Sequence, residues 1–306
     1  MAASKQDLAI LAVAIAAIST AAVLIREAAA PTLVIAAYRL GLASLPLLLF
    51  AAVRGQPLRP TSWRRAGLTL VAGSFLALHF GFWIASLKET TVISSVVLVT
   101  TQPLFVAIAS GPLLGERPGT SVWLGIAVAA AGAVVMVAAD VGAGAGSLVG
   151  DGFALLGAVF AAAYILVGRG VLSLSKDGLR SSGSDWLPYV TVVYATAALL
   201  LLAALAIAGE ALTGYDGETY LFLVLLALVP QLIGHSAINR SLGYLPAAAV
   251  AVAILGEPVG ATLLAALFLA ETPSPVEAGG GLLVLAGVYL GLRPTLFGSP
   301  RLLAPE

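Results

Sequence analysis

Residues 100–119 of this 306-residue chain read TTQPLFVAIASGPLLGERPG, and residues 255–274 read LGEPVGATLLAALFLAETPS. An offset of 155 positions aligns the two stretches, and it extends without a gap to residues 86–132 and 241–287. The aligned identities include Pro103 with Pro258, Glu116 with Glu271, Pro118 with Pro273, Gly125 with Gly280, and Gly132 with Gly287. Because prolines and glutamates are scarce in so apolar a chain, these matches indicate an internal duplication.

Composition places the chain in a membrane. Hydrophobic residues make up 60% and charged residues only 10%, against about 25% charged in ordinary soluble domains. The mean hydropathy is +1.05. The net charge is zero, which disfavours nucleic acid as a partner, and the absence of cysteine excludes disulfides, thiolate metal sites and a Cys nucleophile. The predicted surroundings are membrane lipid, and no metal or cofactor is expected.

Crossing the hydrocarbon core takes about 20 apolar residues in a helix. Division of the sequence at its charged and Pro/Gly-rich breaks gives ten such segments, predicted at 8–25, 32–53, 66–87, 91–114, 120–139, 152–172, 187–208, 219–242, 246–269 and 276–292. The predicted fold class is therefore an all-α polytopic membrane protein. Five helices per repeat is an odd number, so the second repeat, residues 146–306, is expected to be inverted relative to the first, residues 1–145.

The positive charges fall mainly on one side of this arrangement. One side would hold Lys5, Arg54, Arg59, Arg64, Arg65, Arg117, Arg169, Lys176, Arg180, Arg240, Arg293 and Arg301, and the other side only Arg26 and Lys88. Cytoplasmic loops carry the excess of Lys and Arg in membrane proteins. The bias of twelve to two predicts a protein of the inner (cytoplasmic) membrane with both termini in the cytoplasm.

The duplicated motifs resemble a known family. Gln102-Pro103, the run from Gly115 to Pro118, their copies around Glu257-Pro258 and Glu271, and Tyr38-Arg39-Leu40 together resemble the EamA repeat of the drug/metabolite transporter superfamily. One departure is Ala270, which stands where the first repeat has Gly115. The resemblance implies ten helices and a small-metabolite exporter, with amino acids among the substrates of the family. It also implies a central cavity lined by helices 1, 3, 4, 6, 8 and 9, with the fifth helix of each repeat at the periphery.

Glu257 is the only carboxylate near the centre of a predicted span. Pro258 removes a backbone N–H and disfavours helical geometry at Glu257, so the helix is expected to kink there and open a pocket. Removal from water favours the neutral, protonated form of a carboxylate. Glu257 is therefore predicted to couple transport to protons or to bind a substrate amine. The alternative is a neutral side chain that hydrogen-bonds the kinked helix.

Other polar and aromatic side chains fall within predicted spans. The repeat offset brings His79 to within one residue of His235, and Asn239 lies on the same helical face as His235. Trp83 lies one turn after His79, and Tyr164 lies mid-span. Neutral imidazoles that bond between helices are the alternative. The candidate substrate-binding residues are His79, Trp83, Gln102, Tyr164, His235, Asn239 and Glu257.

Arg39 aligns with Tyr194, so this charge belongs to one repeat only. Its predicted role is structural: the guanidinium would reach toward the headgroups or bond freed carbonyls. Contact with an anionic group of the substrate is the alternative. The pairs Gly111/Gly115 and Gly287/Gly291 are spaced for close helix packing, which is expected within a monomer, with a weak homodimer as the alternative.

The predicted function is a secondary transporter, not an enzyme. The sequence has no His-Glu-x-x-His motif, no Asp-rich pair for magnesium and no nucleotide-binding loop. Sparse polar groups near the midplane and two inverted repeats suit alternating access. The leading hypothesis is export of an amino acid or related compound. The alternatives are a facilitative, channel-like carrier and a multidrug exporter for cationic compounds.

Overall fold

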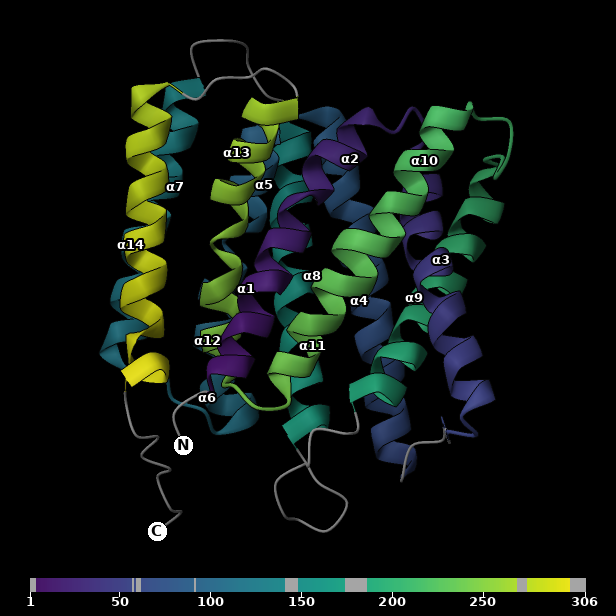
Figure 1. Ribbon diagram of the computed structural model, residues 1–306, viewed down its shortest axis with the longest axis horizontal. Coiled ribbons are helices and arrows are strands. Elements are labelled where there is room, and N and C mark those ends of the chain that lie inside the picture. Colours follow the sequence, from purple (N-terminus) through teal and green to yellow (C-terminus); the bar gives the residue numbers. More distant parts are fainter. Residues whose placement is uncertain are drawn as a thin grey trace.

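A computed structural model describes residues 4–56, 58, 62–90, 92–140, 148–173, 186–268 and 274–297, and all regular elements in these ranges are helices (Figure 1). The N-terminal part comprises α1 (Lys5–Ser19), α2 (Ala21–Glu27), α3 (Thr32–Val53), α4 (Trp63–Glu89), α5 (Val92–Val99), α6 (Gln102–Leu114) and α7 (Thr120–Asp140). The C-terminal part comprises α8 (Leu148–Ser173), α9 (Trp186–Ala208), α10 (Gly217–Leu226), the π-helix η1 (Ala227–His235), α11 (Ser236–Leu242), α12 (Ala247–Ile254), α13 (Glu257–Phe268) and α14 (Pro275–Phe297).

These elements confirm the ten predicted spans. Nine are helical rods long and apolar enough to cross a membrane within the described ranges, and the tenth, α7, has a shorter apolar stretch at Thr120–Val135. Four predicted spans are interrupted: α1 and α2 form the first, α5 and α6 the fourth, α12 and α13 the ninth, and α10, η1 and α11 the eighth. The predicted glycine-rich loop at 142–146 lies outside the described residues.

Two of the interruptions occupy the same position in the duplicated sequence. Thr100 and Thr101 separate α5 from α6, and Leu255 and Gly256 separate α12 from α13. The offset of 155 relates the two breaks. A proline follows each break as the second residue of the new helix, where its missing N–H leaves no intrahelical bond unmade. The kink predicted at Glu257 is therefore a full break in the helix.

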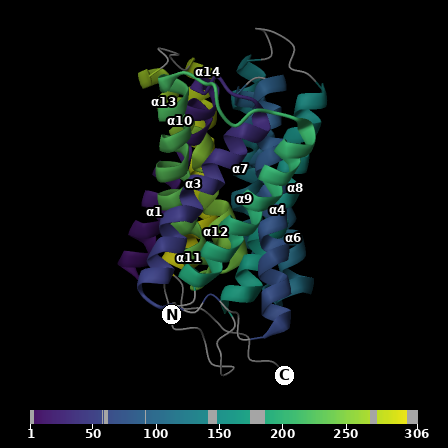
Figure 2. The same cartoon turned by 90° about the vertical axis from the view of Figure 1, so that its right-hand side faces the viewer.

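Helices α7 and α14 form one flank of the bundle (Figure 1). The opposite flank, formed by α3, α9 and α10, faces the viewer in Figure 2. Between the flanks, α4 packs on α8 and α9, α1 packs on η1 and α13, and the two lower half-helices, α6 and α12, pack on each other. The fifth helix of each repeat is thus peripheral, as the family resemblance implies.

Glycines allow α7 and α14 to touch backbone to backbone. A Cβ atom at Gly125 would lie 2.6 Å from the carbonyl oxygen of Gly287, and one at Gly287 would lie 2.5 Å from the backbone nitrogen of Ala129. Gly132 faces the carbonyl oxygen of Gly280 in the same way. Without a hydrophobic effect between helices in lipid, such close packing supplies the attraction.

The two glycine pairs singled out in the sequence behave differently. Gly287 and Gly291 lie in the α7–α14 contact, as expected for packing within the monomer. The prediction is wrong for the other pair, because a Cβ atom at Gly111 would meet only the Glu116 carbonyl oxygen, at 3.9 Å. Gly115 instead ends α6 in a left-handed conformation, with φ of 68°, which glycine adopts without steric cost.

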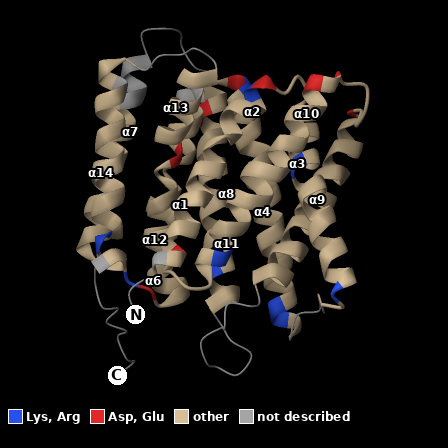
Figure 3. Cartoon of the chain, in the orientation of Figure 1, with Lys and Arg blue, Asp and Glu red and all other residues tan. Residues whose placement is uncertain are grey.

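Charges divide between the two ends of the bundle (Figure 3). Lys and Arg side chains gather at the end where α1 begins and α14 ends, and Asp and Glu gather at the opposite end. Arg26 in the last turn of α2, and Lys88, which donates to the Ala28 carbonyl oxygen at 3.1 Å, lie at the acidic end. Arg39 lies at neither end, because it is within the bundle and fully buried. The asymmetry predicted from the sequence is therefore present along the long axes of the helices.

We expect Gly125→Ala and Gly287→Ala each to destabilise the folded protein by about 1–3 kcal/mol, because an added methyl group has no space between two backbones. Gly279→Ala on α14 is the matched control, since nothing lies within 4 Å of its Cβ position. Thermal unfolding of the detergent-purified variants measures the difference. Equal melting temperatures for Gly125→Ala and Gly279→Ala would contradict the packing described here.

Candidate functional site

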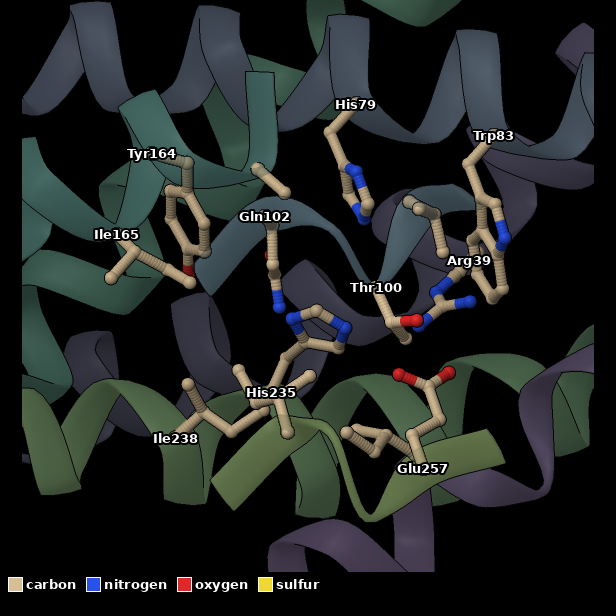
Figure 4. Close-up of a pocket in the computed structure, with 14 residues that line it drawn as sticks. Arg39, His79, Trp83, Thr100, Gln102, Tyr164, Ile165, His235, Ile238 and Glu257 are labelled. Carbon is tan, nitrogen blue, oxygen red and sulfur yellow. The ribbon is translucent and has the colours of Figure 1, made fainter. Parts of the chain in front are cut away.

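A cavity of about 30 Å³ lies inside the bundle, at the level of the two helix breaks. It is lined by Ile18, Arg39, His79, Trp83, Val99, Thr100, Gln102, Ala161, Tyr164, Ile165, His235, Ile238, Ile254 and Glu257 (Figure 4). Spans 1, 3, 4, 6, 8 and 9 contribute, as the resemblance implies, and Arg39 adds span 2. This volume has room for about two water molecules.

The helix breaks place two polar residues at corresponding points of the cavity wall. Gln102 is the first residue of α6, and Glu257, its counterpart under the repeat offset, is the first residue of α13. Both are largely buried, with 6% and 9% of the residue exposed. The first turn of each of these helices carries backbone N–H groups that have no intrahelical partner.

Close contact between α1 and α13 sets the position of Glu257. The hydroxyl of Ser19 donates to the Glu257 carbonyl oxygen at 3.3 Å and to the Ile15 carbonyl oxygen at 2.8 Å. A Cβ atom at Gly260 would overlap the Ser19 side chain, so glycine is required for this approach. Helix α1 therefore crosses α13 one turn after the break and fixes the first turn of α13.

Arg39 lies in the wall of the cavity, not at the headgroups. The residue is 0% exposed, and its Nε donates to Gln231 Oε1 at 2.8 Å. The guanidinium carbon lies 4.0 Å from the ring centroid of Phe80 and 5.8 Å from that of Trp83. The expectation that the side chain reaches toward the headgroups is wrong, because an amide from η1 and two aromatic rings hold it inside the bundle.

The two histidines reach the cavity from opposite walls. Nδ1 of His79 donates to the Gly157 carbonyl oxygen at 2.9 Å; because a carbonyl only accepts, this nitrogen carries the proton. The His79 ring stacks on Trp83, with centroids 5.9 Å apart and planes 6° from parallel. His235 contacts Phe80 edge to face at 5.2 Å. Both imidazoles line the same cavity. His79 therefore bonds a neighbouring helix through Nδ1 and also borders the cavity.

Asn239 lies behind the cavity wall. It is 0% exposed, and its amide nitrogen donates to the hydroxyl of Tyr164 and to the carbonyl oxygen of His235 at 2.7 Å. Tyr164 itself borders the cavity. Of the seven candidate residues, the structure brings six to one cavity and places Asn239 as a hydrogen-bonding support for Tyr164.

Sequence reasoning missed two members of this region. Thr100 lines the cavity at the α5–α6 break, and Gln231 orients Arg39 from the π-helical segment. The repeat supplied a signal for Thr100, because it aligns with Leu255 directly before the Glu257 turn. Gln231 gave no comparable signal, since small and polar residues in spans commonly serve packing.

An ion pair joins several helices at the end of the bundle where α1 begins. Glu116 Oε1 accepts from Arg169 Nε at 2.6 Å, and Glu116 Oε2 accepts from the Ala247 amide at 2.9 Å. Arg169 Nη1 also donates to the Leu242 carbonyl oxygen at 2.8 Å. These bonds link the α6–α7 corner, α8 and the α11–α12 connection.

The arrangement suits binding of a small polar solute. Among the described residues no group of three or more His, Cys, Asp or Glu is placed to hold a metal ion. The cavity instead combines one guanidinium, one carboxylate, two imidazoles and the aromatic rings of Trp83 and Tyr164 at mid-depth of an apolar bundle. Ten membrane-spanning helices around a buried, charged cavity are the architecture of a membrane transporter.

The particular family follows from sequence comparison. The sequence profile of the EamA-like transporter family matches residues 7–138 and again residues 148–293. The chain therefore belongs to the EamA-like transporter family. A crystal structure of another protein has the same fold, with a TM-score of 0.77 at 20% sequence identity over 96% of this chain and 98% of that one.

Three relatives resemble the chain over most of their lengths. The uncharacterized transporter YdfC of Bacillus subtilis is 27% identical over 260 residues, covering 83% of this chain and 79% of that protein. A protein of Salmonella typhimurium named probable amino-acid metabolite efflux pump is 26% identical over 266 residues, covering 86% of each. Its namesake in Escherichia coli is 27% identical over 266 residues, covering 86% of this chain and 87% of that protein.

Thiol labelling tests this placement, because the chain has no native cysteine. We expect a water-soluble thiol reagent to modify His235→Cys and to modify Asn239→Cys at least about tenfold more slowly, because a buried thiol is inert. Ile233→Cys, on the outward face of the same segment, should not react when the protein is in lipid, and Ala211→Cys in the exposed α9–α10 connection should react fully. Equal labelling at 235 and 239 would contradict the position of Asn239 behind the wall.

Proposed function

We propose that this EamA-like transporter is a secondary transporter that exports an amino acid or related compound across the cytoplasmic membrane by alternating access. The observation that carries the proposal is the cavity at the two helix breaks, with Arg39 and Glu257 on its walls. Charged groups at membrane depth are costly and mark solute or ion pathways. Two relatives bear the name probable amino-acid metabolite efflux pump, which supports the substrate class.

The duplication supports alternating access. The helix breaks at Thr100 and Leu255 are related by the repeat offset, and the family profile matches the chain twice. Two inverted repeats of residues 1–145 and 146–306 would exchange conformations, so that one end opens as the other closes. The Glu116–Arg169 ion pair ties α8 to the α6–α7 corner at one end of the bundle, and it is expected to break when that end opens.

Glu257 is proposed to couple export to protons. Its carboxylate borders the cavity. No side-chain nitrogen of a described Lys, Arg or His lies within 4.0 Å of the carboxylate oxygens, so the carboxylate forms no ion pair with them. A carboxylate that holds either a proton or a substrate amine, but not both, exchanges one for the other. Such competition moves solute outward as protons move inward.

The alternatives are a facilitative carrier and an exporter of cationic drugs. A carrier without coupling would use the same cavity but ignore a pH gradient. The buried Arg39 disfavours a cationic cargo, because like charges repel strongly where water is excluded. An amino acid, which carries both charges, suits the cavity better than a cation does.

Exchange of Glu257 for Gln tests the coupling. In proteoliposomes with an acid interior, wild-type protein should accumulate a labelled substrate, because protons leaving the vesicle drive the solute inward. Glu257→Gln keeps the size of the side chain but cannot ionise, so this accumulation should be lost while exchange of labelled for unlabelled substrate at saturating concentration persists. Glu218→Gln, at an exposed position, is the matched control. Normal gradient-driven uptake by folded Glu257→Gln would remove Glu257 from coupling.

Reporter fusions test the orientation and the inverted repeats. The positive-inside bias places fusions after Arg65 and after Arg180 in the cytoplasm, and an odd number of crossings places a fusion after Gly144 outside. A paired alkaline phosphatase and fluorescent protein series reads both outcomes. A cytoplasmic signal at Gly144 would overturn the inversion of the second repeat.

A further inference from the structure

The cavity wall beside Arg39 carries hydrogen-bond donors that have no acceptor. Nη1 and Nη2 of Arg39 and Nε1 of Trp83 are buried, and none of them has a hydrogen-bond partner among the residues that the structure describes. The orientation of Arg39 is nevertheless fixed, because Gln231 holds its Nε at 2.8 Å and Phe80 covers one face of the guanidinium. Buried donors without acceptors are destabilising, so a ligand that supplies acceptor oxygens gains affinity here.

The free part of this guanidinium matches a carboxylate. Its two terminal nitrogens present parallel N–H groups in a rigid plane, which is the geometry that binds both oxygens of a carboxylate or two oxygens of a phosphate. With Nε already bonded to Gln231, only this edge of Arg39 remains for a ligand. Arg39 is thus a built anion subsite within an apolar bundle.

Glu257 supplies the opposite charge in the same cavity. Its carboxylate points toward the region of Thr100 and Arg39 in Figure 4, and both charged side chains line the same cavity. The two groups form no ion pair within 4.0 Å among the described residues. Each therefore keeps bonding capacity for a ligand group of the other sign, and a doubly charged anion such as phosphate would be repelled by Glu257.

Apolar and aromatic side chains lie on the side of the cavity away from these charges, beyond Gln102 and His235. Figure 4 shows Arg39, Trp83 and Glu257 toward one side, and Tyr164, Ile165 and Ile238 toward the other. A ligand that fits both sides carries its two charges close together at one end and an apolar group at the other end. This is the shape of an α-amino acid with an apolar side chain.

We propose that the cavity binds an apolar α-amino acid in one fixed orientation. The carboxylate of the ligand bonds Nη1 and Nη2 of Arg39, its ammonium bonds the carboxylate of Glu257, and its side chain packs against Tyr164, Ile165 and Ile238. This inference rests on the proposed transport function and adds the substrate class and the role of Arg39, which becomes a binding residue. The existing volume is too small for such a ligand, so binding accompanies opening of one end.

Electrostatics favour an α-amino acid over an amine without a carboxylate or an acid without an ammonium group. Arg39 and Glu257 together are neutral, and a zwitterion adds no net charge to the bundle interior. A lone amine or a lone acid adds one uncompensated charge where the effective dielectric constant is low, which is costly. The site is therefore expected to reject ligands that lack one of the two groups.

Binding to purified, detergent-solubilised full-length protein tests the proposal with three related probes. Leucine carries both charges, 3-methylbutylamine lacks the carboxylate, and 4-methylpentanoate lacks the ammonium. Wild-type protein should bind leucine at least about tenfold more tightly than either analogue, which is the contribution of one charge-assisted hydrogen bond. Valine and phenylalanine extend the amino-acid set.

Two variants should give a crossed pattern, in which each variant weakens the binding of a different pair of the three probes. Glu257→Gln should weaken leucine and the amine at least about tenfold without weakening the acid, and Arg39→Gln should weaken leucine and the acid without weakening the amine. Arg54→Gln and Glu218→Gln make the same replacements at exposed positions and should bind as wild type does. If Arg39→Gln does not fold, Arg39→Lys keeps the charge but loses the two-point geometry, and should weaken the acid more than the amine.

The outcomes separate this proposal from the transport function. Equal loss of all three probes in either variant, or no binding of leucine, valine or phenylalanine to wild-type protein, would overturn the proposed site. Transport of another solute together with that result would leave the transporter function intact. The crossed pattern without movement of labelled leucine in proteoliposomes would instead refute transport and retain the site.

Discussion

A helix that stops halfway across a bilayer leaves amide and carbonyl groups that hydrocarbon cannot satisfy. Of the four interrupted rods in the described chain, two stop at corresponding positions of the repeats, at Thr100 and at Leu255, and other helices enclose both breaks. Helices α1 and α8 and the pair α7 and α14 contact the broken rods, and the cavity lies where the breaks occur. The arrangement of the bundle therefore follows from the need to keep these breaks away from lipid.

A second constraint concerns the buried charges. Arg39 needs support inside an apolar bundle, and it receives that support from Gln231 and Phe80, which belong to different helices. Such support leaves Nη1 and Nη2 of the guanidinium without a partner in the described part of the chain. A site prepared in this way loses little freedom on binding, which is the general advantage of a preorganised binding site.

The sequence predicted much of this structure, because its strongest signals are local. Runs of apolar residues set the spans, and Pro258 after Glu257 indicated the break. The six cavity residues were found because polar groups are rare at membrane depth. The position of Arg39 was not predictable, because a guanidinium seven residues into a span can turn outward or inward, and the residue that decides, Gln231, is 192 positions away.

Two further differences between the predicted and observed site also arise because neighbouring helices are not known from the sequence. Asn239 has the right helical spacing to line the cavity with His235, yet the hydroxyl of Tyr164 holds it behind the wall. Gly111 has the right spacing for a helix contact, but among the described residues a Cβ atom there would meet only the Glu116 carbonyl oxygen, at 3.9 Å. Spacing along a helix determines which residues share a face, and only the neighbouring helices determine what that face touches.

The contact between α7 and α14 has a consequence for how such a protein diversifies. Gly125 and Gly287 meet backbone to backbone, so no change of a neighbouring side chain can make room for a larger residue at either position. Neither glycine borders the cavity, and the cavity residues do not belong to α7 or α14. Substitutions that alter cargo can therefore accumulate around the cavity while this helix pair stays unchanged, which lets one scaffold acquire new substrates without a new fold.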